Sequence, residues 1–224
     1  MKKVPADPAA SPRRPRGRPR EFDREQALER AMQVFWEKGF EATSISDLTE
    51  AIGINPPSLY AAFGDKERLF LAALERYLAM RTDSCPYESE PTAEEATRKL
   101  LTYMAQDLSA SGHPKGCLMV MSIATSSNAS PALHQALARN SAQSRARMKA
   151  RFELAIREGE LPADTDAGEL VDFYFAVLAG MSLRAKAGTT RKSLMSIVET
   201  AMRAWPQPPP RARRKERAAS ATAD

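Results

Sequence analysis

The side chains with the widest chemical repertoire are few in this chain of 224 residues. It holds two cysteines, Cys85 and Cys117, and two histidines, His113 and His134. Neither cysteine belongs to a Cys-x-x-Cys pair or to a Cys/His cluster with the spacing of zinc ligands. The sequence also lacks the Gly-x-Ser-x-Gly, His-Glu-x-x-His, phosphate-loop and dinucleotide-binding motifs. We therefore expect no metal, no cofactor and no enzymatic activity.

Cys117 has the surroundings of a reactive thiol. It falls at the expected start of a helix, beside Lys115, and both features lower the pKa of a thiol. Two interpretations stay open: a sensor of oxidants or electrophiles, and a small buried residue with no chemical role.

A basic run near the N-terminus, RPRGRPREF, offers a different chemistry. Arg16, Arg18 and Arg20 alternate there with glycine and proline, in a pattern similar to the arms that some proteins lay in the minor groove of DNA. We therefore predict that these three arginines contact DNA.

Charge is distributed unevenly along the chain, whose net charge is +5. Residues 1–20 hold seven Lys/Arg against one Asp, and residues 206–224 hold five against two acidic residues, which leaves −4 for residues 21–205. Both ends are rich in Pro, Arg and Ala and are predicted to be disordered. Attraction to nucleic acid would come mainly from these ends, although the charge of residues 206–224 could serve solubility alone.

The folded part of the chain is expected to be helical. Apolar side chains between residues 21 and 205 recur at intervals of three and four and almost nowhere at every second position. We predict an all-α chain of about nine helices. Capping residues place the starts of the first four helices after Asp23, Ser44, Asn55 and Asp65. Gln26 should complete a capping box with Asp23. The short second and third helices flank a turn that contains glycine, as in a helix-turn-helix motif.

The later helices are predicted to start after Thr92, Ser130 and Asp166, with a last helix that ends near Trp205. The run 173–183 is apolar nearly throughout, but it has about half of the ~20 residues that a membrane crossing needs. The N-terminus lacks the apolar segment of a secretion signal. We expect a cytoplasmic protein.

Residues 42–74, ATSISDLTEAIGINPPSLYAAFGDKERLFLAAL, resemble the DNA-binding domain of the TetR (tetracycline-repressor) family of bacterial regulators. The similarity lies in the Thr-Ser-Ile start, the Ile-Gly-Ile and Ser-Leu-Tyr triplets, Phe63, and a Lys-Glu pair followed by Leu69. The resemblance implies four segments: a basic arm (1–20), a helix-turn-helix domain (21–66), a helical ligand-binding and dimerisation domain (67–205) and a basic tail (206–224).

The resemblance also implies a homodimer that binds a palindromic operator through two recognition helices in successive major grooves, and that responds to an unknown small-molecule inducer. The residues that would face DNA are Ser44, Ser46, Pro56, Pro57, Ser58, Tyr60 and Lys66. Phosphate contacts would come from Ser44, Tyr60 and Lys66, and contacts to base edges from Ser46, Pro57 and Ser58. Ala61 and Ala62 depart from the family, in which an aromatic residue or histidine commonly precedes Phe63.

The C-terminal domain of the family carries the inducer pocket and the dimer interface, and no residue there transfers by motif. The ligand candidates, chosen by position and by aromatic, Met or thiol character, are Tyr103, Cys117, Met121, Phe152, Phe173 and Tyr174. The last two helices are expected to form a four-helix interface with their copies through Phe175, Leu178, Gly180, Leu194, Ile197, Val198, Ala201 and Trp205. Plain core packing is the alternative for both sets.

Three functions therefore compete. The leading hypothesis is a ligand-responsive repressor. The second is a repressor that senses oxidants or electrophiles through Cys117, and the third is a constitutive architectural DNA binder that uses the basic ends. A sizeable cavity within residues 67–205 would argue against the third.

Overall fold

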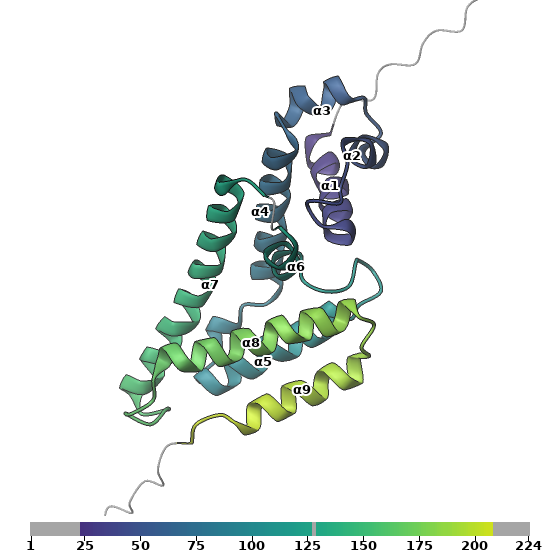
Figure 1. Cartoon of the computed structure of the whole chain (residues 1–224). Coiled ribbons are helices and arrows are strands. Elements are labelled where there is room, and N and C mark those ends of the chain that lie inside the picture. The colour runs from purple at the N-terminus through teal and green to yellow at the C-terminus, as the bar shows by residue number, and fades with distance from the viewer. Residues whose placement is uncertain (1–22, 127–128, 208–224) are drawn as a thin grey trace, which may run out of the picture.

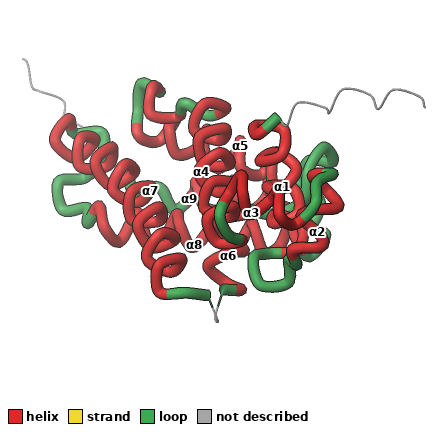
Figure 2. Tube along the Cα trace, turned by 90° about the horizontal axis from the view of Figure 1, so that it is seen from above, coloured by secondary structure: helices red, strands yellow, loops and turns green. Residues whose placement is uncertain are grey.

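The computed structural model describes residues 23–126 and 129–207. Within these ranges the chain forms helices and connecting turns without a strand (Figure 2). The α-helices of the described chain are α1 (Arg24–Lys38), α2 (Ile45–Ile52), α3 (Pro56–Phe63), α4 (Lys66–Ser84), α5 (Ala93–Leu108), α6 (Leu118–Thr125), α7 (Pro131–Glu158), α8 (Ala167–Lys186) and α9 (Arg191–Arg203). The prediction of an all-α chain of about nine helices is confirmed. None of these helices has the length and apolar character of a membrane span.

Side chains that accept hydrogen bonds from free backbone N–H groups fix the helix starts. The predicted caps all do so, namely Asp23, Ser44, Asn55, Asp65, Thr92, Ser130 and Asp166. Reciprocal capping boxes join Ser44 to Asp47 and Thr92 to Glu95. The Gln26 side chain, expected to complete a box with Asp23, accepts a hydrogen bond from Arg30 on the surface of α1.

The helices form two parts that share one apolar core (Figure 1). At one end lie α1, α2 and α3, and α4 runs from them into a larger body. In that body α5, α8 and α9 pack against one another, α7 flanks them, and α6 lies in the middle. The shared core extends from Ala27 in α1 to Trp205 after α9.

Bulky side chains from α1 and α4 fill the core of the smaller part. Phe35 is fully buried, and its ring meets that of Phe70 edge-on with 5.1 Å between centroids. Leu59 and Phe63 of α3 point into this core as predicted, with exposed fractions of 0% and 7%. α3 packs against α2 and α4, and its residues Pro56, Pro57, Ser58 and Tyr60 are exposed.

Hydrogen bonds made by Trp36 and by Lys186 tie the end of α1 to the larger body. Trp36 donates from Nε1 to the carbonyl oxygen of Gly116, 2.9 Å away in the turn before α6. Lys186 at the end of α8 donates from Nζ to the carbonyl oxygen of Glu37 at 3.0 Å. The helix that supports α2 and α3 is thus in direct contact with the body.

Candidate nucleic-acid interface and internal cavity

The two short helices α2 and α3 are joined by a tight turn of three residues. Gly53 adopts a left-handed conformation (φ 82°) that other residues rarely take, and its N–H closes α2 on the carbonyl of Thr49. Asn55 then accepts a hydrogen bond from the Ser58 N–H and starts α3. Arg30 of α1 donates from Nη1 to the Ile52 carbonyl at 3.0 Å, which fixes the end of α2. The pair has the geometry of a helix-turn-helix unit.

Most of the residues predicted to face DNA are exposed on the surface of this unit. Exposed side chains are those of Ser44, Ser46, Pro56, Pro57, Ser58 and Tyr60. Tyr60 is 46% exposed, in contrast to its buried neighbour Leu59. The predicted minor-groove residues Arg16, Arg18 and Arg20 lie outside the described residues.

Lys66 differs from the other predicted contacts because it is half-buried. Its Nζ lies 4.6 Å from the centroid of the Phe40 ring and 3.4 Å from the Glu41 carbonyl oxygen. Burial lowers the pKa of Lys66, although the charges of Glu41 and Asp47 act in the opposite direction. Its ammonium group is therefore partly engaged within the protein.

Ser44 can cap a helix and meet a phosphate at the same time. Its Oγ accepts the Asp47 N–H at 3.0 Å, so its hydroxyl hydrogen can still be donated outward. Asp47 is held by Lys38, whose Nζ is 2.6 Å from Oδ1, and by the Ser44 N–H, 2.8 Å from Oδ2. These hydrogen bonds, that of Lys38 first, lower the pKa of Asp47 to about 2. The carboxylate therefore stays ionised and keeps Ser44 in place.

A cavity of about 380 Å³ lies within the larger body. Side chains from α4, α5, α6, α7 and α8 line it, most of them apolar. Two predicted ligand residues, Tyr103 and Cys117, belong to the lining, whereas Met121, Phe152, Phe173 and Tyr174 do not. Phe152 and Tyr174 are buried beside Trp205 in an aromatic cluster, and Phe173 is 41% exposed.

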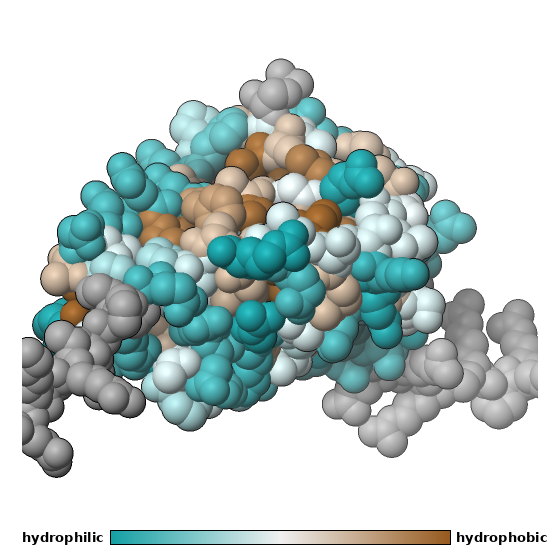
Figure 3. All heavy atoms as spheres, turned by 90° about the horizontal axis from the view of Figure 1, so that it is seen from below, coloured by the Kyte–Doolittle hydropathy of each residue, from teal (hydrophilic) through white to brown (hydrophobic). Residues whose placement is uncertain are grey.

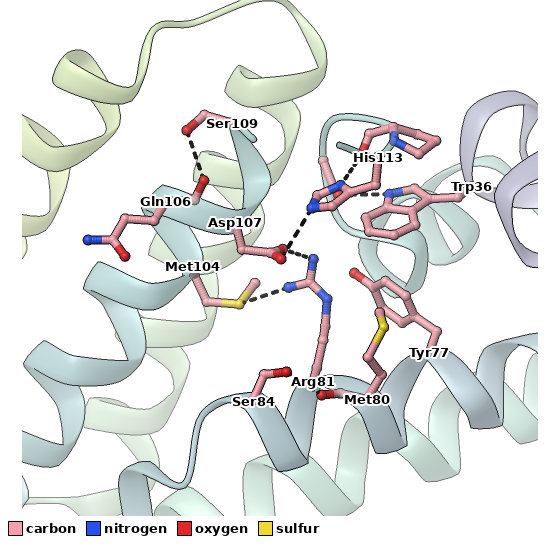
Figure 4. A network of polar contacts seen from close by, with 12 residues as sticks. Trp36, Tyr77, Met80, Arg81, Ser84, Met104, Gln106, Asp107, Ser109 and His113 are labelled. Atoms are coloured by element: carbon pink, nitrogen blue, oxygen red, sulfur yellow. Dashed lines mark hydrogen bonds and ion pairs between the residues drawn. The ribbon is translucent and has the colours of Figure 1, made fainter. Parts of the chain in front are cut away.

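A network of polar contacts at the cavity wall centres on Arg81, which the sequence reasoning missed (Figure 4). The Arg81 side chain is only 9% exposed and pairs with Asp107 of α5. Its guanidinium carbon lies 4.6 Å from the Tyr77 ring and 5.7 Å from the Trp36 ring. His113 stacks on Trp36 and lies 3.3 Å from Asp107. Arg81 thus lines the cavity and also contacts Trp36 of α1.

Burial and neighbouring groups shift the pKa values of Arg81 and Tyr77 in this network. Burial acts to lower the pKa of Arg81, but Tyr77, Cys117 and Asp107 outweigh it, and the pKa is raised. Burial, followed by the nearby Cys117 thiol, raises the pKa of the Tyr77 hydroxyl well above its usual range. Arg81 remains a cation and Tyr77 a neutral hydroxyl at physiological pH. One sequence signal could have found Arg81, because it continues the buried stripe of Leu74 and Tyr77 at helical spacing.

Cys117 lies at the start of α6, as predicted, and is 7% exposed. Its backbone N–H donates to Ser182 Oγ at 2.8 Å, and the next N–H, that of Leu118, donates to the Tyr77 hydroxyl at 3.2 Å. The thiol belongs to the cavity wall. A molecule inside the cavity would therefore meet it.

Comparison with known proteins agrees with this architecture. A family described as bacterial regulatory proteins of the tetR family matches residues 27–73, and the tetracyclin repressor-like C-terminal domain matches residues 95–203. The transcriptional repressor ComR of Escherichia coli strain K12 is 36% identical over 196 residues, which cover 86% of this chain and 93% of ComR. The chain belongs to the TetR family.

Among solved TetR structures, a cysteine mutant of CifR in complex with a 26-base-pair double-stranded operator DNA is 43% identical. The similarity covers 85% of this chain and all of that chain, with a TM-score of 0.79. A TetR regulator from Rhodococcus sp. RHA1 is 38% identical over 82% of this chain, with a TM-score of 0.57. The resemblance to the TetR family read from the sequence is confirmed.

The residues expected at a TetR dimer interface lie in three kinds of surroundings. Buried within the protomer are Leu194, Val198, Ala201 and Trp205. Phe175 and Leu178 are half-buried and line the cavity, and Ile197 is half-buried against the core. Gly180 alone of the set is exposed, with no atom within 4 Å of the position that a Cβ would take.

Proposed function

We propose that the chain is a homodimeric transcriptional repressor that binds operator DNA through α2 and α3 and is released by a small molecule held in the cavity. The observation that carries the proposal is the exposure of six predicted contact residues on a helix-turn-helix unit whose apolar residues Leu59 and Phe63 are buried. CifR, in a TetR structure solved with operator DNA, supports it. We assign DNA recognition to residues 21–66, and ligand binding and dimerisation to residues 67–205. A bacterial regulator of this kind works in the cytoplasm, and we propose that location.

In this proposal the exposed hydroxyls have distinct tasks. Ser44 and Tyr60 donate to phosphate oxygens, and Ser46 and Ser58 approach base edges, where a hydroxyl pairs with donors or acceptors. Pro56 and Pro57 offer apolar contact, for example to a thymine methyl group. Lys66 contributes less than the resemblance implies, because its ammonium is already shared with Phe40 and Glu41.

The basic arm compensates for an acidic recognition domain. Residues 21–80 hold six Lys/Arg against eleven Asp/Glu, whereas residues 1–20 hold seven against one. We propose that Arg16, Arg18 and Arg20 follow the minor groove beside each half-site, where narrow A·T-rich segments concentrate negative potential.

Deletion of residues 1–20 tests the arm. Each phosphate contact contributes about 0.9 to the slope of log affinity against log salt. Fluorescence anisotropy titrations from 50 to 300 mM salt should show weaker operator binding and a shallower slope for the shortened chain. An unchanged slope would mean that the arm does not contact the phosphate backbone.

An apolar stripe along α8 supports the dimer. Partly or fully exposed residues follow one another at helical spacing on its free side, namely Phe173, Ala176, Val177, Gly180 and Leu183. Phe173 and Leu183 are 41% and 48% exposed, which is unusual for large apolar side chains. Seen from below, the side on which α8 and α9 lie shows apolar residues gathered within a polar rim (Figure 3). We propose this α8 stripe as the centre of the interface, with Gly180 allowing close approach of the partner.

The central experiment is selection of operator DNA from random duplexes with the full chain. A palindromic consensus with two half-sites about one helical turn apart is expected, because a two-fold dimer presents its recognition helices at that spacing. Selection of no preferred sequence would contradict the repressor and favour the architectural binder. The cavity argues against that alternative, since a constitutive binder has no use for it.

Thiol sensing through Cys117 is the second candidate, favoured by its place on the cavity wall. An electrophile that enters the cavity would meet its sulfur. Mass spectrometry after mild oxidant treatment should locate the modification, and loss of DNA binding should disappear in Cys117→Ser. Persistent oxidant sensitivity in that variant would exclude this route, and Cys85→Ser provides the matched control because Cys85 lines the same cavity.

A further inference from the structure

The lining of the cavity is mostly apolar, but it also carries positive charge. The described residues that line it include three arginines, Arg81, Arg145 and Arg147, but no aspartate, glutamate or lysine. The carboxylates that pair with these arginines lie outside the lining and belong to Asp107, Asp172 and Glu88. A molecule inside the cavity therefore meets guanidinium groups and no carboxylate.

Arg81 is the most enclosed of the three arginines. Its side chain is 9% exposed, compared with 39% for Arg145 and 44% for Arg147. This difference places Arg81 at the inner end of the cavity, and the other two toward solvent. A charged group of a ligand would gain most at Arg81, because water screens it least there.

The guanidinium of Arg81 lacks strong acceptors on two of its three nitrogens. Nη2 pairs with Asp107, whereas the acceptor of Nη1 among the described residues is the sulfur of Met104 at 3.1 Å, and thioether sulfur is a weak acceptor. Nε is buried and has no acceptor within the described part of the chain. Buried polar groups are otherwise nearly always hydrogen-bonded, so an unpaired donor calls for an explanation. A guanidinium offers five N–H groups in a planar fork that matches a carboxylate.

We propose that the cavity takes a small carboxylic acid with an apolar body, bound as its anion with the carboxylate on Arg81. The inference rests on the proposed function, because it gives a chemical class to the inducer. Leu78, Leu100, Met119 and Val120 supply apolar walls for the body of the ligand. A volume of about 380 Å³ is at the lower end of the range for ligand sites, which favours a small acid.

The same arginine would carry the effect of the ligand toward DNA. A ligand carboxylate competes with Asp107 for Arg81, and Asp107 keeps His113 as its other partner. Arg81 also packs over Trp36, which belongs to the helix that supports α2 and α3. A change of partner at Arg81 therefore alters contacts at the end of α1 directly.

Calorimetry on the full chain tests the ligand class with two probes, 4-phenylbutyrate and octanoate, each compared with its uncharged amide. At least one acid should bind about tenfold to a hundredfold more tightly than its amide, because a hydrogen-bonded charge pair is lost in the amide. Arg81→Met should reduce this ratio to about one. Arg98→Met, at a residue of α5 that pairs with Glu199 of α9 and is absent from the lining, should leave it unchanged. The affinities of acid and amide are compared within each variant. A general loosening of the cavity would weaken both and leave their ratio unchanged.

A second measurement uses the unaltered chain and does not depend on the folding of Arg81→Met. With the carboxyl carbon of the probe labelled with ¹³C, NMR should show that the bound acid stays ionised to lower pH than the free acid, because a cation lowers the pKa of a carboxyl beside it. Amides that bind as tightly as acids, a bound carboxyl that titrates no lower than the free acid, or no binding of either acid at millimolar concentration would overturn the proposal. In each of these cases the chain should still bind its operator sequence-specifically. Failure of the carboxylate proposal is therefore distinguishable from failure of the proposed repressor function.

Discussion

The helix-turn-helix face and the cavity are built in opposite ways. The face uses one continuous stretch, residues 44–63, whose caps, paired prolines and single left-handed glycine each act on their near neighbours. The cavity draws on five helices and on residues from Tyr77 to Ala179. Local chemistry therefore specifies the part that would read DNA, whereas packing over long sequence distances specifies the part that would bind a ligand. Trp36 and Arg81 lie where the two parts meet.

The largest effect is expected from Trp36→Ala, which removes the contact between the two parts. Trp36 is 2% exposed, stacks with His113 and donates to Gly116. Truncation of a buried aromatic side chain lowers the free energy of unfolding by about 3–5 kcal/mol, measurable by urea denaturation. Trp36→Phe keeps a ring but loses the donor, and should cost less. A loss below about 1 kcal/mol for Trp36→Ala would mean that the two parts are stable without this contact.

Phe173→Glu is expected to break the dimer without damage to either part. Two carboxylates would be placed in an apolar interface, at a cost of at least about 1 kcal/mol each, so the dimer dissociation constant should rise by about thirtyfold or more. Sedimentation equilibrium measures this change. Leu154→Glu on α7 introduces the same charge at a side chain that is 37% exposed, and should leave the dimer intact. A dimeric Phe173→Glu protein would place the interface elsewhere.

Tyr60→Phe tests the DNA face alone. Loss of a hydroxyl that donates to phosphate should cost about 1–2 kcal/mol per half-site, visible as weaker operator binding in anisotropy titrations. The stability of the protein should not change, because Tyr60 is 46% exposed. Equal affinity of Tyr60→Phe and the unaltered protein would show that the ring only packs on the surface. Ligand binding in the cavity should be the same in both proteins.

The smallest effect concerns pH and the cap of α2. The pKa of Asp47 is lowered from 3.8 to about 2 in the fold, so folding favours its ionised form. The stabilisation is complete above about pH 4 and is lost as pH falls through 2. Thermal unfolding at pH 5 and pH 2.5 should therefore show a fall in stability that is smaller in Asp47→Asn. An identical fall in both proteins would assign it to other carboxylates.

The sequence predicted more of the face than of the cavity, for a physical reason. Caps such as Ser44 and Asn55 act within three residues, so both helix starts and the exposure of Tyr60 could be read locally. The helical spacing of Leu74 and Tyr77 could have indicated that Arg81 is buried, but its partners Trp36 and Asp107 come from distant helices. Of the predicted ligand residues, Tyr103 and Cys117 lie on the lining, whereas the aromatic residues Phe152 and Tyr174 pack in the core. The type of a side chain and its helical spacing do not distinguish a residue that lines a cavity from one that packs in a filled core.

The hydrogen bond from Trp36 to Gly116 bears on attempts to build hybrid regulators. A chimera made by joining residues 1–66 to the body of another relative would cut the chain at the start of α4, yet the bond joins residues 80 positions apart across that cut. The recipient body would have to present a carbonyl oxygen at the place of Gly116, whose positive φ of 88° favours glycine. Recipients that keep a glycine there are the ones in which a transplanted recognition domain should still respond to the ligand of its host.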